Sequence, residues 1–243
     1  MKTKSILITL ISLVVVFTSC SKIGNRISPS SNITTVERTV DSYNKLDVSD
    51  AFNVVVTFSE EEESVFVEAN DNLHQYIQID NSNNALRVKM ANNITLSGKE
   101  AILNIFIKTK NISAFYISGA SQLKLDNLLS TDNVEIDLSG ASSMRGEIQV
   151  DEMRVELSGS SILSLKGESN ILDLSFSGAS AMNDFDFKTN SLNADLSGAS
   201  NVSLEVNNKL EVDASGASNV FYKGNGIVYS QSLTGASQIV KLN

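Results

Sequence analysis

Ser118-Gly119-Ala120-Ser121 is the first copy of a four-residue motif that returns through the rest of the chain. The steps between successive copies are 21, 19, 19, 20, 18 and 19 residues. The later copies are Ser139-Gly140-Ala141-Ser142, Ser158-Gly159-Ser160-Ser161, Ser177-Gly178-Ala179-Ser180, Ser197-Gly198-Ala199-Ser200, Ser215-Gly216-Ala217-Ser218 and Thr234-Gly235-Ala236-Ser237. Self-similarity at a near-constant period is typical of a solenoid, in which each repeat buries its apolar face by stacking on its neighbours.

The residues around each motif alternate between apolar and polar, as in Val134-Glu135-Ile136-Asp137-Leu138. Alternation with a period of two is typical of a strand with one buried face. The position before the motif holds Ile117, Leu138, Leu157, Phe176, Leu196, Ala214 and Leu233, and an apolar column after it holds Leu123, Met144, Leu163, Met182, Val202, Val220 and Ile239. Each repeat is therefore predicted to form a strand, a corner, a second strand and a polar return. Tyr229, in the column five positions before the motif, is expected to face the core.

The predicted fold is all-β: a right-handed parallel β-helix, or β-solenoid, with coils of about 19 residues over residues 113–243. Equivalent residues of successive coils then lie about 4.8 Å apart, and parallel crossovers prefer the right hand. In each corner, Gly permits a positive φ and the small Ala or Ser beside it allows close stacking. We expect the Ser hydroxyls to bond backbone groups there. Alternatively, the flat Ser and Ala array is a docking surface for a glycan or a partner protein.

Residues 37–112 show a less regular β pattern. Short apolar runs between polar turns predict strands near residues 36–40, 45–48, 53–58, 65–69, 77–80, 85–90 and 102–108, with one helical turn at 73–78. Terminal repeats of a solenoid are atypical because they must cover the end of the core. This region is therefore expected to form the opening coils and their cap, joined to the regular coils without a linker.

The chain begins with the features of an export signal. Lys2 and Lys4 precede an apolar run over residues 6–17, which has the length of a signal peptide and is too short for a bilayer span. The run leads into Thr18-Ser19-Cys20, which resembles a bacterial lipobox, and Cys20 is the only cysteine. We predict a lipoprotein signal peptide over residues 1–19, a lipidated Cys20 that holds the protein on a membrane surface, and a flexible tether over residues 20–36. The expected location is the cell envelope, as an outer-membrane lipoprotein.

The mature chain is strongly acidic. Removal of residues 1–19 leaves 17 basic and 28 acidic residues, a net charge of −11. This charge opposes binding to nucleic acid and to anionic lipid headgroups.

Carboxylates recur at the exposed position two before the motif, in Asp137, Glu156, Asp195 and Asp213. Stacked at strand spacing, they could hold Ca²⁺, which takes six to eight oxygen ligands. They could also form an acidic cleft like those of β-helical polysaccharide lyases and hydrolases. The simplest interpretation is a solvated face that keeps a long rod soluble.

No motif in the chain indicates a reaction. A catalytic Ser needs a base, whereas the motif Ser is repeated along the chain and His74 is the only histidine. No phosphate-binding loop, dinucleotide fingerprint, HExxH motif or CxxC pair occurs. We therefore predict no catalytic residue and no cofactor apart from the Ca²⁺ considered above.

The segment from Tyr43 through Val56, the stretch Val65-Phe66-Val67-Glu68-Ala69, and the repeated Ser-Gly-Ala-Ser resemble the putative auto-transporter adhesin head GIN domain family. The resemblance covers about residues 40–240 and implies a β-helical fold in an exported or lipid-anchored protein of Bacteroidetes-type bacteria. The chain shows neither C-terminal membrane-barrel strands nor a coiled-coil stalk, so the resemblance extends to the adhesin half of the family name.

The sequence favours a non-enzymatic, lipid-anchored binding or adhesin-like module that presents an extended face to a glycan or an envelope protein. One alternative is a carbohydrate-active β-helix enzyme, a lyase or a hydrolase. Such an enzyme needs paired carboxylates, or a base with bound Ca²⁺, in a concave site. Another alternative is a passive scaffold in the envelope.

Replacing Cys20 with Ser removes the thiol that lipidation requires. We expect Cys20→Ser protein to leave the membrane fraction, while a Ser21→Ala control remains in it. Membrane fractionation and mass spectrometry of the mature N-terminus measure the two effects. Wild-type protein without an N-terminal lipid would contradict the prediction.

Overall fold

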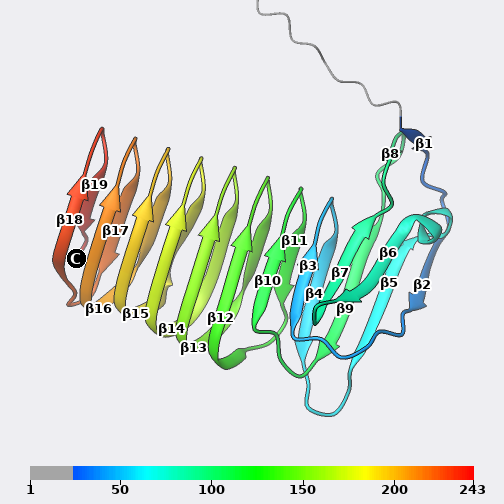
Figure 1. The fold of residues 1–243 in the computed structure, drawn as a ribbon, viewed down its shortest axis with the longest axis horizontal. Helices are drawn as coiled ribbons and strands as arrows, with labels where there is room; N and C mark the ends of the chain where they lie inside the picture. Colours follow the sequence, from blue (N-terminus) through cyan, green and yellow to red (C-terminus); the bar gives the residue numbers. More distant parts are fainter. Residues whose placement is uncertain (1–23) are drawn as a thin grey trace, which may run out of the picture.

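The computed structural model describes residues 24–243, and its strands stack into a long β-solenoid (Figure 1). Its elements are β1 (Asn25–Ile27), β2 (Ile33–Glu37), β3 (Lys45–Val48), β4 (Asn53–Phe58), β5 (Ser64–Asn70), the 3₁₀ helix η1 (Asp71–Tyr76), β6 (Ile77–Ser82), β7 (Ala85–Met90), β8 (Ile94–Leu96), β9 (Leu103–Thr109), β10 (Ala114–Ile117), β11 (Gln122–Leu125), β12 (Leu129–Leu138), β13 (Ser143–Leu157), β14 (Ile162–Phe176), β15 (Ala181–Leu196), β16 (Asn201–Ala214), β17 (Asn219–Lys223), β18 (Ile227–Leu233) and β19 (Gln238–Lys241). The predicted all-β solenoid is confirmed.

Each regular coil is a flattened loop with two edges. The pairing of β13 with β14 runs from Ser143–Ile162 to Val150–Ser169 and resumes at Glu152–Ile171. The chain turns from one sheet to the other at the skipped residues, Asp151 and Asn170. We call this edge the bend edge, and the edge of Ser-Gly-Ala-Ser motifs the corner edge. The strand segments before the corners form the first sheet, and those after the corners form the second sheet.

The interior of the solenoid is built from columns of apolar side chains. Leu138 pairs with Leu157, Leu157 with Phe176, and Phe176 with Leu196 in successive coils. All four side chains are at most 2% exposed, as are Met144, Leu163 and Met182 from the column after the corner. The predicted stacking is confirmed, and burial of this continuous spine supplies the main driving force for folding.

One backbone conformation and two hydrogen bonds at the corner explain its sequence. Gly178 has a φ of +75°, in the left-handed region that Gly adopts without steric cost. The next residue, Ala179, donates its N–H to the Gly159 oxygen of the preceding coil at 2.8 Å. Ser180 is fully buried, and its hydroxyl donates to the Ser177 carbonyl at 2.8 Å. The expected bonding of Ser hydroxyls to the backbone is therefore confirmed.

One corner of the stack has no glycine, because Ser49-Asp50-Ala51-Phe52 stands in place of the motif. Asp50 has a φ of +76° and lies beneath Gly119, and β3 and β4 on either side of it pair in parallel with β10 and β11. Asp tolerates the left-handed region better than most residues. Its carboxylate also accepts a hydrogen bond from the Met90 N–H at 2.7 Å. The stack of corners therefore begins at β3, within the region 37–112 that was predicted to form the opening coils and their cap.

The N-terminal end is covered by a cap. Strands β7 and β9 extend the two sheets in parallel beside β3 and β4. Antiparallel pairing then adds β5 to β9, β2 to β5 and β6 to β7. The prediction of a flexible tether over residues 20–36 is wrong for its second part, because β2 pairs with β5 and β1 pairs with β8. The predicted lipidation site, Cys20, lies outside the described residues.

At the other end, the prediction that Tyr229 faces the core is wrong. A register shift between β16 and β18 stacks Val228 on Leu210, and Tyr229 is 72% exposed. The Lys209 ammonium lies 4.7 Å from the centre of its ring, a cation–π distance.

No helix in the described part of the chain is long and apolar enough to cross a membrane.

Replacing Gly178 with Val tests the corner. A Cβ at this position would lie 2.4 Å from the Gly159 oxygen, and the positive φ adds strain. We expect the free energy of unfolding to fall by about 2 kcal/mol or more. A Ser175→Val control, at an exposed strand position of the same coil, should change it by less than about 0.5 kcal/mol. Urea unfolding measures both, and an unchanged Gly178→Val stability would contradict the role of the corner.

Candidate functional site

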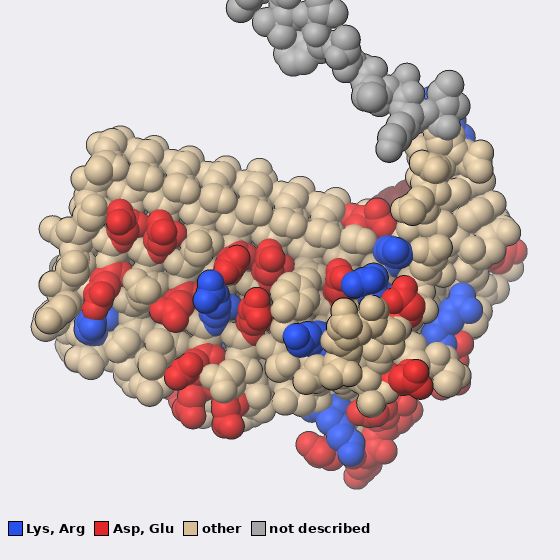
Figure 2. Space-filling view, viewed as in Figure 1, with Lys and Arg blue, Asp and Glu red and all other residues tan. Residues whose placement is uncertain are grey.

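Charged side chains gather on the outer face of the first sheet, where red carboxylates outnumber blue basic groups (Figure 2). The register stacks Asp137 on Glu156 and Asp195 on Asp213, with Ser175 between the two pairs. The predicted acidic column therefore exists as two pairs and not as a continuous row.

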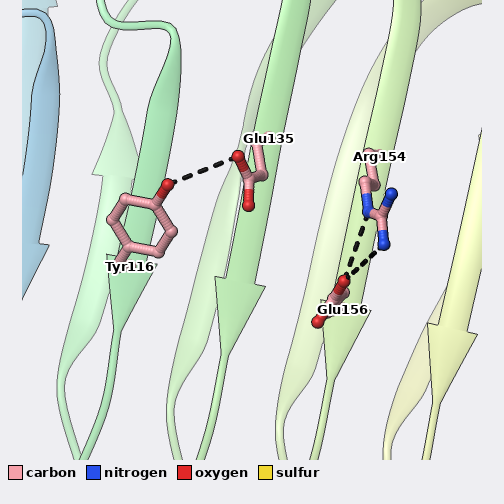
Figure 3. A network of polar contacts seen from close by, with 4 residues as sticks. All are labelled: Tyr116, Glu135, Arg154 and Glu156. Atoms are coloured by element: carbon pink, nitrogen blue, oxygen red, sulfur yellow. Dashed lines mark hydrogen bonds and ion pairs between the residues drawn. The ribbon is translucent and has the colours of Figure 1, made fainter.

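The carboxylates near Asp137 are partly held by neighbouring side chains (Figure 3). Arg154 donates to Glu156 from Nε at 3.2 Å and from a terminal nitrogen at 2.9 Å. Tyr116 donates its hydroxyl to Glu135 at 3.3 Å, and burial together with this carboxylate raises the pKa of the tyrosine. Burial, followed by repulsion from Glu156 and Glu135, raises the pKa of Asp137.

This arrangement does not build a cation site. Among the residues that the structure describes, no three acidic, His or Cys side chains are placed to hold a metal ion. Arg154 already neutralises Glu156, and Ser175 separates the two pairs. We therefore attach no metal to Asp137, Glu156, Asp195 and Asp213.

A groove with a volume of about 490 Å³ lies along the bend edge. Nearly all of its lining is polar: Ser130, Thr131, Asp132, Gln149, Val150, Asp151, Glu168, Ser169, Asn170, Lys188, Thr189, Asn190 and Asn207. We call it the bend-edge groove. It crosses successive coils from β12 to β16, so its lining repeats along the solenoid.

Side chains of neighbouring coils bond to one another within the bend-edge groove. The Asn190 amide nitrogen donates to the Asn170 side-chain oxygen at 3.0 Å. Beneath them, Ser169 donates to the Thr189 hydroxyl at 3.1 Å, and both hydroxyl side chains are buried. The Asn pair leaves the amide nitrogen of Asn170 and the amide oxygen of Asn190 outside that contact. A polar ligand could use both groups.

The bend-edge groove could not be located from the polar return that the sequence predicts for each coil. A signal was present, since the position seven residues before each motif is Asn or Asp in all but the last copy. These residues are Asn111, Asp132, Asp151, Asn170, Asn190 and Asn208. Asn and Asp favour turns, so the pattern marks the bend as regularly as Gly marks the corner.

The lone histidine belongs to the cap. His74 lies in η1, where its Nε2 is 3.0 Å from the Thr34 hydroxyl and 3.1 Å from the Thr34 carbonyl oxygen. These contacts tie η1 to β2 and indicate a structural role.

The family model described as "Putative auto-transporter adhesin, head GIN domain" matches residues 42–226. The chain belongs to this family. The match confirms the resemblance found in the sequence and places the GIN-domain protein among adhesin-like proteins of the cell envelope or surface. A search of curated proteins found no match.

Solved structures share the fold of the GIN-domain protein. A putative adhesin from Bacteroides fragilis NCTC 9343 is 22% identical, with a TM-score of 0.82 over 89% of this chain and 100% of that one. A putative lipid binding protein from Parabacteroides distasonis ATCC 8503 is 15% identical, with a TM-score of 0.74 over 90% and 100%. A putative adhesin from Parabacteroides merdae ATCC 43184 is 18% identical, with a TM-score of 0.73 over 90% and 99%. At these identities the comparison establishes the fold alone.

Replacing Asp137 with Asn tests the electrostatics of the first sheet. A raised pKa in the folded protein means that the native state binds a proton more readily than the unfolded chain. Stability from this group is therefore lost as pH rises from the ordinary carboxyl pKa through the raised value. We expect Asp137→Asn to raise the melting temperature of the GIN-domain protein at pH 7, and the gain to shrink as pH falls below about 4. Thermal unfolding across this range measures the difference, and a gain independent of pH would contradict the assignment.

Proposed function

We propose that this GIN-domain protein is a lipid-anchored, non-enzymatic binding protein of the cell envelope, and that its bend-edge groove takes a neutral glycan. The observation behind the proposal is the lining of that groove by amides, hydroxyls and carboxylates from successive coils. Its family and the putative adhesins that share its fold favour a role in adhesion.

The chemistry of the groove suits sugar hydroxyls. Each hydroxyl both donates and accepts hydrogen bonds, and the groove offers both kinds of partner in Asn170, Asn190 and Thr131. Its charged lining comprises Asp132, Asp151, Glu168 and Lys188. Because carboxylates outnumber the single base, an anionic ligand would be repelled, which favours a neutral glycan.

The lack of an aromatic lining favours adhesion through many weak contacts. No aromatic side chain lines it, so no sugar ring can stack on a flat apolar platform there. Contacts to one sugar unit are then weak. Several contacts along the coils, and several anchored molecules on one surface, multiply the affinity through effective concentration.

The predicted lipid on Cys20 would hold several molecules on one membrane surface. The described body begins at residue 24, close to the predicted anchor in sequence. Since β1 and β2 hold the following segment against the cap, we expect the capped end of the solenoid to lie nearer the membrane and the coils to project from it.

Removing the Asn pair tests the proposal. The full-length protein is screened on a glycan array, and the affinity for a bound neutral oligosaccharide is measured by calorimetry. We expect Asn170→Ala together with Asn190→Ala to weaken binding about tenfold, because two hydrogen-bonding groups are lost. Asn193→Ala, an exposed Asn on the first sheet, is the matched control and should bind normally.

Three outcomes would contradict the proposal. Unchanged affinity in the double variant would show that the ligand does not bind in the bend-edge groove. Release of reducing or unsaturated sugar ends by the purified protein would favour the carbohydrate-active enzyme. Failure to bind any glycan would favour the passive scaffold.

A further inference from the structure

A second groove, of about 300 Å³, lies on the outer face of the second sheet. We call it the second-sheet groove. The register places its outward residues in two columns across four coils. One column is Asn53, Gln122, Ser143 and Ile162, and the other is Val55, Lys124, Arg145 and Ser164. At about 4.8 Å per coil, the patch is roughly 14 Å long, which matches two or three sugar units in extent.

The charge of this groove is opposite in sign to the net charge of the molecule. Lys124 and Arg145 line it, and no Asp or Glu does. The chain as a whole has a net charge of −9, and carboxylates line the bend-edge groove. The second-sheet groove is therefore a local basic site on an acidic protein, where an anion is attracted and not repelled.

Arg145 is the base that remains available. Lys124 pairs with Asp126 at 2.6 Å, whereas Arg145 is exposed and takes part in none of the ion pairs of the described residues. Glu147 is two residues further along β13 and is not part of the lining. A guanidinium presents a planar fork of donors that matches a carboxylate in two hydrogen bonds.

The remaining lining suits a sugar ring. Ile162 is 52% exposed and Val55 is half-buried beside Lys124, so each offers an aliphatic surface to the C–H groups of a ring. Gln122, Ser143 and Ser164 place amide and hydroxyl groups on the same face. An apolar surface with a few polar groups and one charge is the usual composition of a small-ligand site.

We propose that the second-sheet groove binds a carboxylate-bearing sugar, such as a uronic acid unit of an acidic glycan. Arg145 pairs with the carboxylate, Ile162 packs against the ring, and Ser143 and Ser164 bond the ring hydroxyls. The inference rests on the proposed glycan-binding function and adds a second site of different charge. The two grooves lie at different places on the coil, so one molecule could engage a neutral and an acidic glycan together.

The test uses the full-length protein and two matched probes, an oligogalacturonate and the neutral galactose oligomer of the same length. We expect the acidic probe to bind and Arg145→Gln to weaken its binding by about tenfold or more, since a charge-assisted bidentate contact is lost. The affinity of Arg145→Lys for the acidic probe should lie between those of wild type and Arg145→Gln. Lys keeps the positive charge but lacks the planar fork of donors. Lys188→Gln, which removes a base from the bend-edge groove, is the control and should bind the acidic probe normally.

Each result separates this inference from the proposed function. Equal binding of the acidic probe by wild type and Arg145→Gln, at equal melting temperature, would overturn the second-sheet site. If Lys188→Gln weakened the binding of the acidic probe and Arg145→Gln did not, the probe would bind in the bend-edge groove and the second-sheet site would be overturned. Absence of acidic binding, with neutral binding that still depends on Asn170 and Asn190, would overturn this inference alone. Loss of affinity for the methyl-esterified acidic probe would support it, because the ester removes the charge that Arg145 pairs with.

Discussion

The structure depends on one hydrogen bond, repeated from corner to corner, from the residue after Gly to the oxygen of the left-handed residue in the preceding coil, which is Asp50 at the first corner and Gly at the others. The bond from Ala199 to Gly178 is 2.7 Å, and those from Ala217 to Gly198 and from Ala236 to Gly216 have the same length. A side chain on these glycines would meet the oxygen below it at about 2.4 or 2.5 Å, so close stacking requires its absence. Because strands on both sides of the corner leave it in fixed directions, this contact sets the register of the two sheets together.

A fixed register decides where every outward side chain lies. Inward positions are used up by the apolar spine, and outward positions are free to differ between coils because they touch only their neighbours above and below. On the first sheet this freedom produces pairs of carboxylates, with Arg154 beside Glu156. On the second sheet it produces the adjacent bases Lys124 and Arg145. One solenoid can thus present faces of different charge without any change to its core.

Features that follow from the repeat period could be predicted from the sequence, whereas features that depend on tertiary contacts could not. Leu138, Leu157 and Phe176 could be placed in one column because the motif fixes their spacing. Asp50 could not be recognised as a corner, since its left-handed φ is supported by a hydrogen bond to Met90, which is distant in sequence. β2 follows the Ser- and Asn-rich residues 28–32, which favour a tether, and it is held in place by its pairing with β5. Tyr229 leaves the core through a register shift that alternation alone does not reveal. The outward columns could be listed from the motif, but neither groove could be located from them, because a hollow depends on the shape of the sheet.

The varying coil length shows where such a fold can change. Copies of the motif are 18 to 21 residues apart, and the corners still stack without a break. The length differences among β14, β15 and β16 are absorbed by register shifts. One lies between Leu163 and Gly167, where β14 pairs with β15. The others lie between Asn183 and Lys188 and between Thr189 and Ser191, where β15 pairs with β16. Two of these shifts lie between corner and bend, and the third spans the bend at Asn190. Lys188 and Thr189 also line the bend-edge groove. An insertion there reshapes the groove and leaves the corner bonds intact, whereas an insertion at a corner would break the register of both sheets. The lining of the bend-edge groove can therefore change at little cost in stability.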